Sequence, residues 1–286
     1  MLAEVSLHRP GDLAEALGIL AEPPGGRPLT VLAGGTDLLV LQNSGSFVPE
    51  SVLDLWRLDA LRGIEQREDG ALWLGALSTY QDLIQSPLVQ RHIPALVEAS
   101  RTVGAVQIQS RGTLGGNVAN ASPAGDTLPV LLAHGTRVVL VSAVNGERLV
   151  DFDDFYQGYR APDIRSGELI KGFLVDPLPE GGSSSFRKVG TRLAQAISKV
   201  MLCGVASLGS DGRVDFIRLA AGSVAPVPVR LLGAESAALG GVPAEVLDAV
   251  RDAAREDVQP IDDVRSNEEY RREVSSRLAV RFVGSL

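Results

Sequence analysis

Two glycine-rich segments constrain this chain more than any other feature of its sequence. Residues 31–39 read VLAGGTDLL and residues 113–117 read TLGGN, so each segment places two glycines directly before a side chain that can form hydrogen bonds. Because glycine has no Cβ, such a stretch lets backbone N–H groups approach a diphosphate closely. Although far apart in sequence, the two segments could therefore close on one long anionic cofactor from both sides.

The second segment lies in a stretch that is rich in both glycine and polar residues. Residues 112–126 hold four glycines together with Thr113, Asn117 and Asp126. Thr113 and Asn117 offer side-chain hydrogen bonds, and Asp126 offers a carboxylate that could hold a hydroxyl or a ribose. The alternative interpretation is an irregular loop with Asp126 as a helix N-cap. The first segment alone is equally consistent with a strand-to-helix turn, and neither segment is a P-loop or a GxGxxG fingerprint.

Composition and charge exclude several classes of function. The net charge of −8 and the pI near 5.0 argue against nucleic-acid binding, which needs a basic face. The single cysteine, Cys203, cannot form an internal disulfide, an iron–sulfur cluster or a Cys-based zinc site, and we expect a buried core thiol. The three histidines lie far apart in sequence, which argues against a His-rich metal site. Without a signal sequence at residues 1–5 or a long apolar run, we expect a cytoplasmic protein with no membrane span.

Hydrophobic periodicity and turn residues predict the order of the elements. The predicted helices are 12–21, one beginning at 78–81, 126–133, 234–239, 243–255 and 268–283. The predicted strands are 29–33, 63–67, 71–77, 137–142, 148–150, 168–175, 185–190, 199–208 and 214–220. The composition break PLPEGGSSS at 177–185 predicts a boundary between domains 1–178 and 179–286. Strands followed by helices indicate an α+β unit at the C-terminus.

Further motifs point to a known family. They are VGAVQI at 103–108, RG at 111–112, SPAGD at 122–126, FYQGYR at 155–160, ELI at 168–170, FRKVG at 186–190 with Arg192, Ala194 and residues 196–197, and DDVRS at 262–266 with YRR at 270–272. With the paired glycine segments, they span nearly the whole chain. On these residues the chain resembles the FAD-binding medium subunit of the molybdenum hydroxylases, the family of carbon monoxide dehydrogenase and xanthine dehydrogenase.

The resemblance implies an α+β fold and a set of cofactor-binding residues. Two α/β subdomains, about 1–60 and 61–178, would clasp an extended FAD in a PCMH-type FAD-binding fold, and a C-terminal α+β domain of antiparallel strands and helices would follow at 179–286. Both glycine segments would wrap the diphosphate, Val103 and Ile170 would lie beside the cofactor, Asp126 would hold the adenosine side and Lys188 would reach the flavin. The implied FAD-binding residues are Val31, Leu32, Ala33, Gly34, Gly35, Thr36, Asp37, Leu38, Val103, Thr113, Leu114, Gly115, Gly116, Asn117, Asp126, Ile170 and Lys188.

The first glycine segment, Lys188 and the stretch 172–176 each need a comment beside this family resemblance. Flavoproteins of the wider fold group can bind FAD covalently through a loop His or Cys, but the first segment has Thr36 and Asp37, so we expect non-covalent FAD. On residue type alone, Lys188 would be a solvated strand lysine. The stretch GFLVD at 172–176 is unusual where the family implies a regular strand next to Ile170.

The function that the resemblance implies is electron transfer, because the flavin supplies the chemistry. Electrons would pass from [2Fe-2S] clusters on a small partner subunit through FAD to NAD⁺, oxygen or a quinone. A large subunit with the molybdenum cofactor would hydroxylate the substrate, in a dimer of heterotrimers. One alternative is a standalone FAD-dependent reductase or oxidase, which would need its own proton donor near the flavin. Another is a flavin-free structural or nucleotide-sensing subunit.

Overall fold

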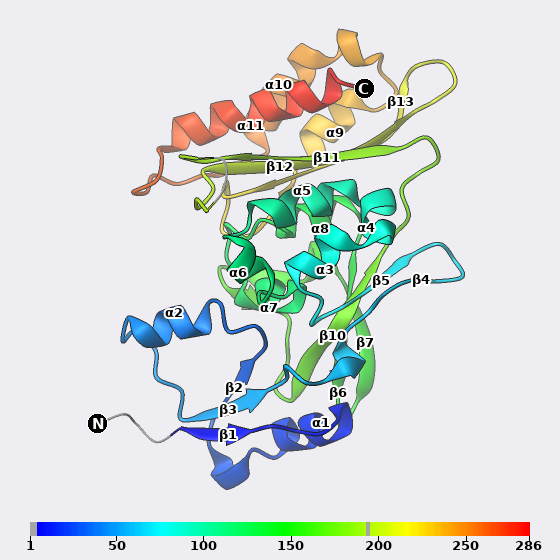
Figure 1. Cartoon of the computed structure of the whole chain (residues 1–286). Helices are drawn as coiled ribbons and strands as arrows, with labels where there is room; N and C mark the ends of the chain where they lie inside the picture. The colour runs from blue at the N-terminus through cyan, green and yellow to red at the C-terminus, as the bar shows by residue number, and fades with distance from the viewer. Residues whose placement is uncertain (1–4, 193–194) are drawn as a thin grey trace.

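The chain builds three successive units, each around its own β-sheet (Figure 1). The computed structural model describes residues 5–192 and 195–286, so Ala194 of the sequence motif lies outside the described residues. In Figure 1 the N-terminal unit is at the bottom, a central unit is in the middle and the C-terminal unit is at the top. The mixed α+β architecture agrees with the predicted fold class.

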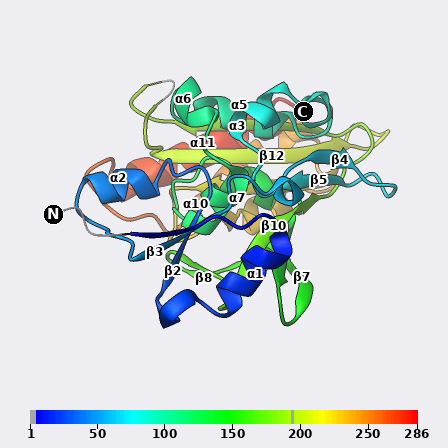
Figure 2. The same ribbon diagram turned by 60° about the horizontal axis from the view of Figure 1, so that its bottom comes forward.

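The N-terminal unit is a small parallel sheet that ends at the first glycine segment. Its strands run in the order β1-β3-β2. The elements are β1 (Ser6–His8), α1 (Leu13–Ala21), β2 (Leu29–Leu32), α2 (Leu38–Asn43) and β3 (Ser51–Asp54). Asp12 caps α1 by accepting the N–H of Glu15, as expected for a helix beginning there. Ala16 and Leu17 of α1 share a buried cluster with Leu169, so the helix lies against the central sheet (Figure 2).

The central unit is an antiparallel sheet in the order β4-β5-β10-β6-β7 with six helices. The strands are β4 (Ile64–Gln66), β5 (Leu72–Gly75), β6 (Arg137–Ser142), β7 (Gly146–Asp151) and β10 (Glu168–Val175), with the hairpin β8 (Tyr156–Gly158) and β9 (Ala161–Pro162) between them. The helices are α3 (Tyr80–Gln85), α4 (Pro87–His92), α5 (Pro94–Thr102), α6 (Val106–Gln109), α7 (Leu114–Asn120) and α8 (Leu128–Ala133).

Strand β10 explains the unusual sequence after Ile170. The strand is continuous, and its register with β6 shifts between Ile170 and Gly172, which is a β-bulge. A Cβ at Gly172 would lie 2.5 Å from the ring of Trp73 on the neighbouring strand. Glycine at this position therefore makes room for the tryptophan, and the irregularity is local.

Two helix starts differ from the sequence prediction. The capping box of α3 is formed by Thr79 and Asp82, one residue later than the expected Ser78–Gln81 spacing, because the Asp82 side chain accepts the N–H of Thr79 at 2.8 Å. The predicted helix 243–255 is broken into a 3₁₀ turn, Pro243–Glu245, and α10, Leu247–Glu256.

The C-terminal unit is a four-stranded antiparallel sheet covered on both faces. It contains β11 (Ser183–Val189), β12 (Val200–Leu208), β13 (Val214–Gly222), β14 (Val229–Arg230), α9 (Leu232–Ala238), α10 and α11 (Glu268–Val283). Alternate residues of β12 face opposite sides: Met201 and Cys203 join the central core, whereas Val200 and Leu202 pack against α9–α11. This explains the continuous apolar run, and Cys203 is a buried free thiol as predicted.

Two features are absent from the described residues: a membrane-spanning helix and a metal-binding group of side chains. Within residues 5–192 and 195–286, no helix is long and apolar enough to cross a lipid bilayer. In the same residues, no group of His, Cys, Asp and Glu side chains is arranged to hold a metal ion.

Candidate functional site

The fold brings the two glycine segments into direct contact. A Cβ on Gly34 would lie only 1.9 Å from the carbonyl oxygen of Arg111, which precedes the second segment. The Arg111 guanidinium also lies 3.6 Å from the centre of the Trp56 ring, just after β3. Glycine at position 34 therefore allows the N-terminal and central units to meet at this point.

The backbone N–H groups of the second segment are already occupied by the protein. Those of Leu114, Gly115, Gly116 and Asn117 donate to the Ser78 carbonyl, the Ala76 carbonyl, the Thr113 hydroxyl and the Thr113 carbonyl, at 2.8 to 3.1 Å. A Cβ on Gly115 would also lie 2.7 Å from the Ala76 oxygen. In the structure these glycines let the first turn of α7 pack against the strand end at Ala76, and the assignment of this segment to the diphosphate stays a prediction.

In the first segment, by contrast, the backbone N–H groups of residues 34–38 are not used by the described part of the protein. Within the described residues, the N–H groups of Gly34, Gly35, Thr36, Asp37 and Leu38 have no hydrogen-bond acceptor. Gly35 adopts φ +75°, which turns the chain between β2 and α2. Successive free N–H groups in a turn form a concave, electropositive site that suits an anion. These N–H groups are therefore available to an anion, and the predicted binding of the diphosphate by this segment stays a prediction.

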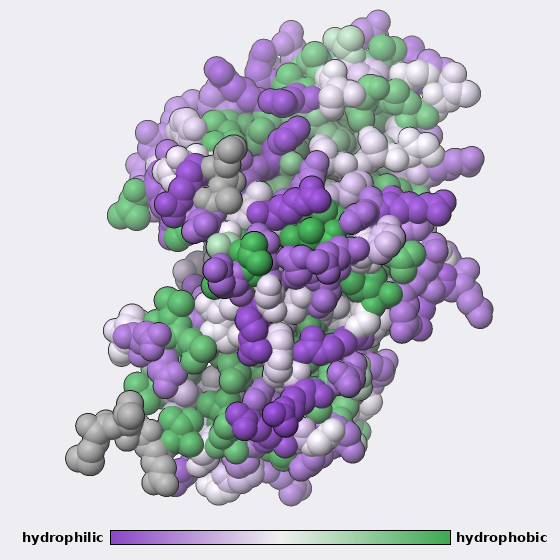
Figure 3. Space-filling model, viewed as in Figure 1, coloured by the Kyte–Doolittle hydropathy of each residue, from purple (hydrophilic) through white to green (hydrophobic). Residues whose placement is uncertain are grey.

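A cleft of about 950 Å³ extends from Asp37 of this segment to the C-terminal unit. Figure 3 shows an indentation between the upper and lower parts of the molecule, on the left of the view. Four predicted residues line the cleft: Asp37, Val103, Asp126 and Lys188. Ile170 instead belongs to the buried core of the central sheet. The remaining predicted residues of the glycine segments lie outside the lining of this cleft among the residues described.

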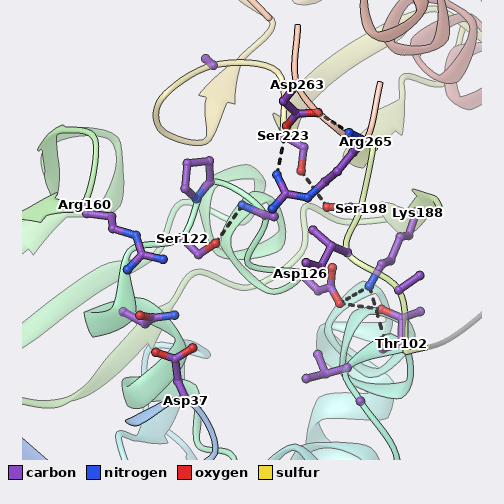
Figure 4. Close-up of a pocket in the computed structure, with 18 of the residues that line it drawn as sticks. Asp37, Thr102, Ser122, Asp126, Arg160, Lys188, Ser198, Ser223, Asp263 and Arg265 are labelled. Carbon is purple, nitrogen blue, oxygen red and sulfur yellow. Dashed lines mark hydrogen bonds and ion pairs between the residues drawn. The ribbon is translucent and has the colours of Figure 1, made fainter. Parts of the chain in front are cut away.

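Lys188 and Asp126 form a buried ion pair on one side of the cleft (Figure 4). The Lys188 Nζ lies 2.5 Å from Asp126 Oδ2, and the two side chains are only 6% and 7% exposed. Thr102 donates its hydroxyl to the same carboxylate at 3.2 Å. Lys188 is therefore not a solvated strand lysine. Burial raises the pKa of Asp126, and the neighbouring Lys188 ammonium partly opposes this.

The ion pair bears on the predicted roles of its two residues. Asp126 was expected at the adenosine side of an extended FAD and Lys188 at the flavin, and the structure places their side chains in contact. Asp126 Oδ1 is buried and, within the described residues, has no hydrogen-bond partner, so it remains available to a bound group.

The opposite side of the cleft comes from the C-terminal unit, and the sequence reasoning assigned it no role. The hydroxyls of Ser198 and Ser223 lie 2.7 Å apart. Arg271 donates to the Ser223 carbonyl at 3.0 Å, and the N–H of Ser223 donates to the Pro123 carbonyl at 2.9 Å. Ser223 has φ +65°, a left-handed conformation that is strained for a non-glycine residue. The available signal was the tail motif YRR, which contains Arg271.

Asp263 fixes the loop that carries the rest of this wall. Burial opposes its ionisation, but N–H groups of Arg265 and Ser266 and the Arg271 guanidinium donate to it and lower the pKa of Asp263 to about 2. Arg271 Nη2 lies 2.6 Å from Asp263 Oδ1. The tail motif DDVRS therefore forms a charged, tightly bonded edge of the cleft.

The β8–β9 hairpin contributes a third edge of the cleft through Tyr159 and Arg160. The hairpin is held against α7, because the Tyr156 hydroxyl donates to the Val118 carbonyl at 2.9 Å. Burial raises the pKa of Tyr156. The chain after the hairpin is fixed by Arg148, whose guanidinium lies 2.7 Å from Glu168 and 2.8 Å from Asp163. Hydrogen bonds from Arg148 lower the pKa of both carboxyls.

Comparison with known protein families identifies both halves of the chain. Residues 3–177 match the family model described as the FAD binding domain in molybdopterin dehydrogenase. Residues 184–286 match the CO dehydrogenase flavoprotein C-terminal domain.

Individual relatives resemble the chain over almost its full length. The putative xanthine dehydrogenase FAD-binding subunit of Escherichia coli (strain K12) is 32% identical, covering 93% of this chain and 90% of that protein. The carbon monoxide dehydrogenase medium chain of Hydrogenophaga pseudoflava is 30% identical, with 97% and 95% coverage. A solved structure of carbon monoxide dehydrogenase from Hydrogenophaga pseudoflava superposes with a TM-score of 0.91 at 29% identity, covering 98% of this chain and 96% of that one.

Proposed function

The chain belongs to the family of FAD-binding medium subunits of xanthine and carbon monoxide dehydrogenases, and we propose that it transfers electrons within a molybdenum hydroxylase. It would receive them from [2Fe-2S] clusters on a small partner subunit and deliver them through FAD to an external acceptor. The molybdenum cofactor would lie on a large partner subunit, in a dimer of heterotrimers. The single cysteine supports this division, because one thiol cannot hold an iron–sulfur cluster.

The observation that carries the proposal is the row of free N–H groups at residues 34–38, of which Asp37 lines one end of the cleft. They suit the diphosphate of FAD, while a cleft of about 950 Å³ offers room for the rest of the cofactor. Bound FAD would supply the redox chemistry, because an isoalloxazine exchanges electrons singly or in pairs.

The chain's own residues would bind and orient the cofactor. We assign residues 31–38 to the diphosphate and residues 113–117 to the support of that loop. Lys188 and Asp126, with Val103 beside them, would flank the flavin end, where a buried ammonium and a free carboxylate oxygen can bond to polar ring atoms. The wall formed by Ser223 and Arg271 would exclude water on the opposite side.

Anaerobic reduction of the flavin tests electron transfer directly. Candidate aldehydes, purines, N-heterocycles and carbon monoxide are added to the isolated chain and to the chain assembled with its partner subunits, and the visible flavin absorbance is followed. We expect one of these substrates to bleach the flavin only in the assembly. If the same substrate bleaches the isolated chain equally fast, the protein is a standalone FAD-dependent reductase or oxidase.

A further inference from the structure

The basic side chains that line the cleft differ in whether a carboxylate of the protein neutralises them. The lining contains four basic side chains: Arg160, Lys188, Arg265 and Arg271. Lys188 is paired with Asp126, and both Arg265 and Arg271 are paired with Asp263. Among the residues that the structure describes, Arg160 has no carboxylate within 4 Å and makes no side-chain hydrogen bond. It is therefore the one lining cation of this set without a carboxylate partner among the described residues, and its guanidinium carbon lies 5.9 Å from the centre of the neighbouring Tyr159 ring.

The backbone holds Arg160 in a costly conformation. Its φ of +52° at the turn between β8 and β9 is left-handed, which non-glycine residues rarely adopt. The turn is nevertheless well supported, because the Tyr156 hydroxyl binds the hairpin to α7. Left-handed arginine at the tip of a fixed hairpin is a strained arrangement of the kind that concentrates at ligand-binding sites.

The position of Arg160 matches the anion-binding end of the cleft. Figure 4 shows Arg160 entering the cleft on the same side as Asp37, while Lys188, Asp126 and Thr102 lie on the other side. Asp37 belongs to the row of free N–H groups, and its own carboxylate has no ion-pair partner among the described residues. A doubly charged diphosphate bound there would be repelled by Asp37 unless a cation compensated for it.

We propose that Arg160 is a further cofactor-binding residue whose guanidinium binds the diphosphate that the N–H groups of residues 34–38 cradle. The assignment rests on the proposed function, that is, on FAD binding in this cleft. A guanidinium presents a planar pair of N–H donors that matches phosphate oxygens, and it stays charged at every physiological pH. Arg160 would thus close the diphosphate site from the side opposite the glycine segment.

Two variants of Arg160 separate its charge from its backbone. Arg160→Gly removes the guanidinium and suits the left-handed φ, so it preserves the turn. Arg160→Lys keeps the charge without the paired donors. Arg281→Ala is the matched control, because Arg281 is an exposed arginine on α11 that does not line the cleft. Circular dichroism of each flavin-free chain verifies that it is folded.

The measurement is the Kd of the full-length, flavin-free chain for FAD and for riboflavin, which lacks phosphate. We expect Arg160→Gly to raise the FAD Kd by about ten- to a hundredfold, as for a lost hydrogen bond to a charged group, and to leave the riboflavin Kd unchanged. Arg160→Lys should recover part of the loss, and Arg281→Ala should match the wild type. The FAD Kd of the wild type should rise more steeply with salt than that of Arg160→Gly.

Two results would overturn the assignment while leaving the proposed function intact. One is wild-type FAD affinity in Arg160→Gly, and the other is an equal loss of riboflavin affinity, which would place Arg160 at the ring. If the wild-type chain itself binds neither FAD nor riboflavin, the proposed function and the assignment fail together.

Discussion

Gly34 and Gly115 show that glycines in similar motifs meet different physical needs. Gly34 lies at the seam between two units, where a Cβ would overlap the Arg111 carbonyl at 1.9 Å. Gly115 lets α7 approach Ala76, and its N–H is used in the protein. The sequence shows where glycine occurs, but it does not show which N–H groups remain free. That distinction is the reason for proposing the first segment as the anion site and the second as its support.

Substituting Gly34 by alanine tests the close contact between the N-terminal and central units, because it adds only a Cβ. We expect Gly34→Ala to destabilise the flavin-free chain by about 1–3 kcal/mol, as overpacking does, and to weaken FAD binding because the loop must move away from Arg111. The measurements are urea unfolding of the flavin-free chain and the FAD Kd.

Gly18→Ala provides the control for the glycine experiment. Gly18 lies inside α1, and a Cβ there meets no atom within 4 Å. It should be neutral or stabilising by up to about 1 kcal/mol, because alanine is the better helix former. A Gly34→Ala chain that unfolds at the wild-type urea concentration and retains FAD would refute the proposed seam.

The sequence motifs pointed to individual residues of the candidate site. They could not show which of these residues the fold brings into contact. The motifs indicated Asp126 and Lys188, but their contact joins residues far apart in sequence and was not predicted. Arg160 belonged to a motif, yet its proposed role rests on its place in the cleft without a carboxylate partner among the described residues, which only the structure reveals.

At the scale of elements, long and regular patterns predicted the fold well. The predicted strands 137–142 and 168–175 and the helix 268–283 coincide with β6, β10 and α11. Short helices were missed: α4 and α5 each begin at a proline and follow one another with a single residue between them. Such short segments gain their stability from tertiary packing rather than from local periodicity.

Strand β11 and the loop before α8 are joined by the Lys188–Asp126 pair, and removing one partner should be costly. Lys188→Met would leave a buried carboxylate unpaired and destabilise the flavin-free chain by about 3–5 kcal/mol at neutral pH. The pKa of Asp126 is already raised in the folded chain and would rise further. Because a raised pKa favours the protonated folded form, the loss should be smaller at pH 5 than at pH 7.5.

Urea unfolding of the flavin-free chain at both pH values measures this effect. The control is the double variant Lys188→Met/Asp126→Asn, which removes the unpaired charge and should recover most of the stability with little dependence on pH. An equal loss for Lys188→Met at both pH values would contradict the role of Asp126 ionisation.

At the scale of the whole molecule, the cleft is formed by all three units together. Asp37 comes from the N-terminal unit, Val103 and Asp126 from the central unit, and Lys188 and Arg271 from the C-terminal unit. The resemblance predicted this general architecture. Residue types alone could not have done so, because the three edges meet through long-range packing, such as the bond from the Ser223 N–H to Pro123.

The central claim is that this cleft holds one FAD without a covalent bond, and acid release of the flavin tests it most directly. The purified chain is precipitated with acid, and the supernatant and pellet are analysed by chromatography and visible absorbance. We predict close to one FAD per chain, all of it in the supernatant. Flavin that stays with the pellet, FMN in place of FAD, or a chain that takes up no flavin when FAD is supplied would contradict the account.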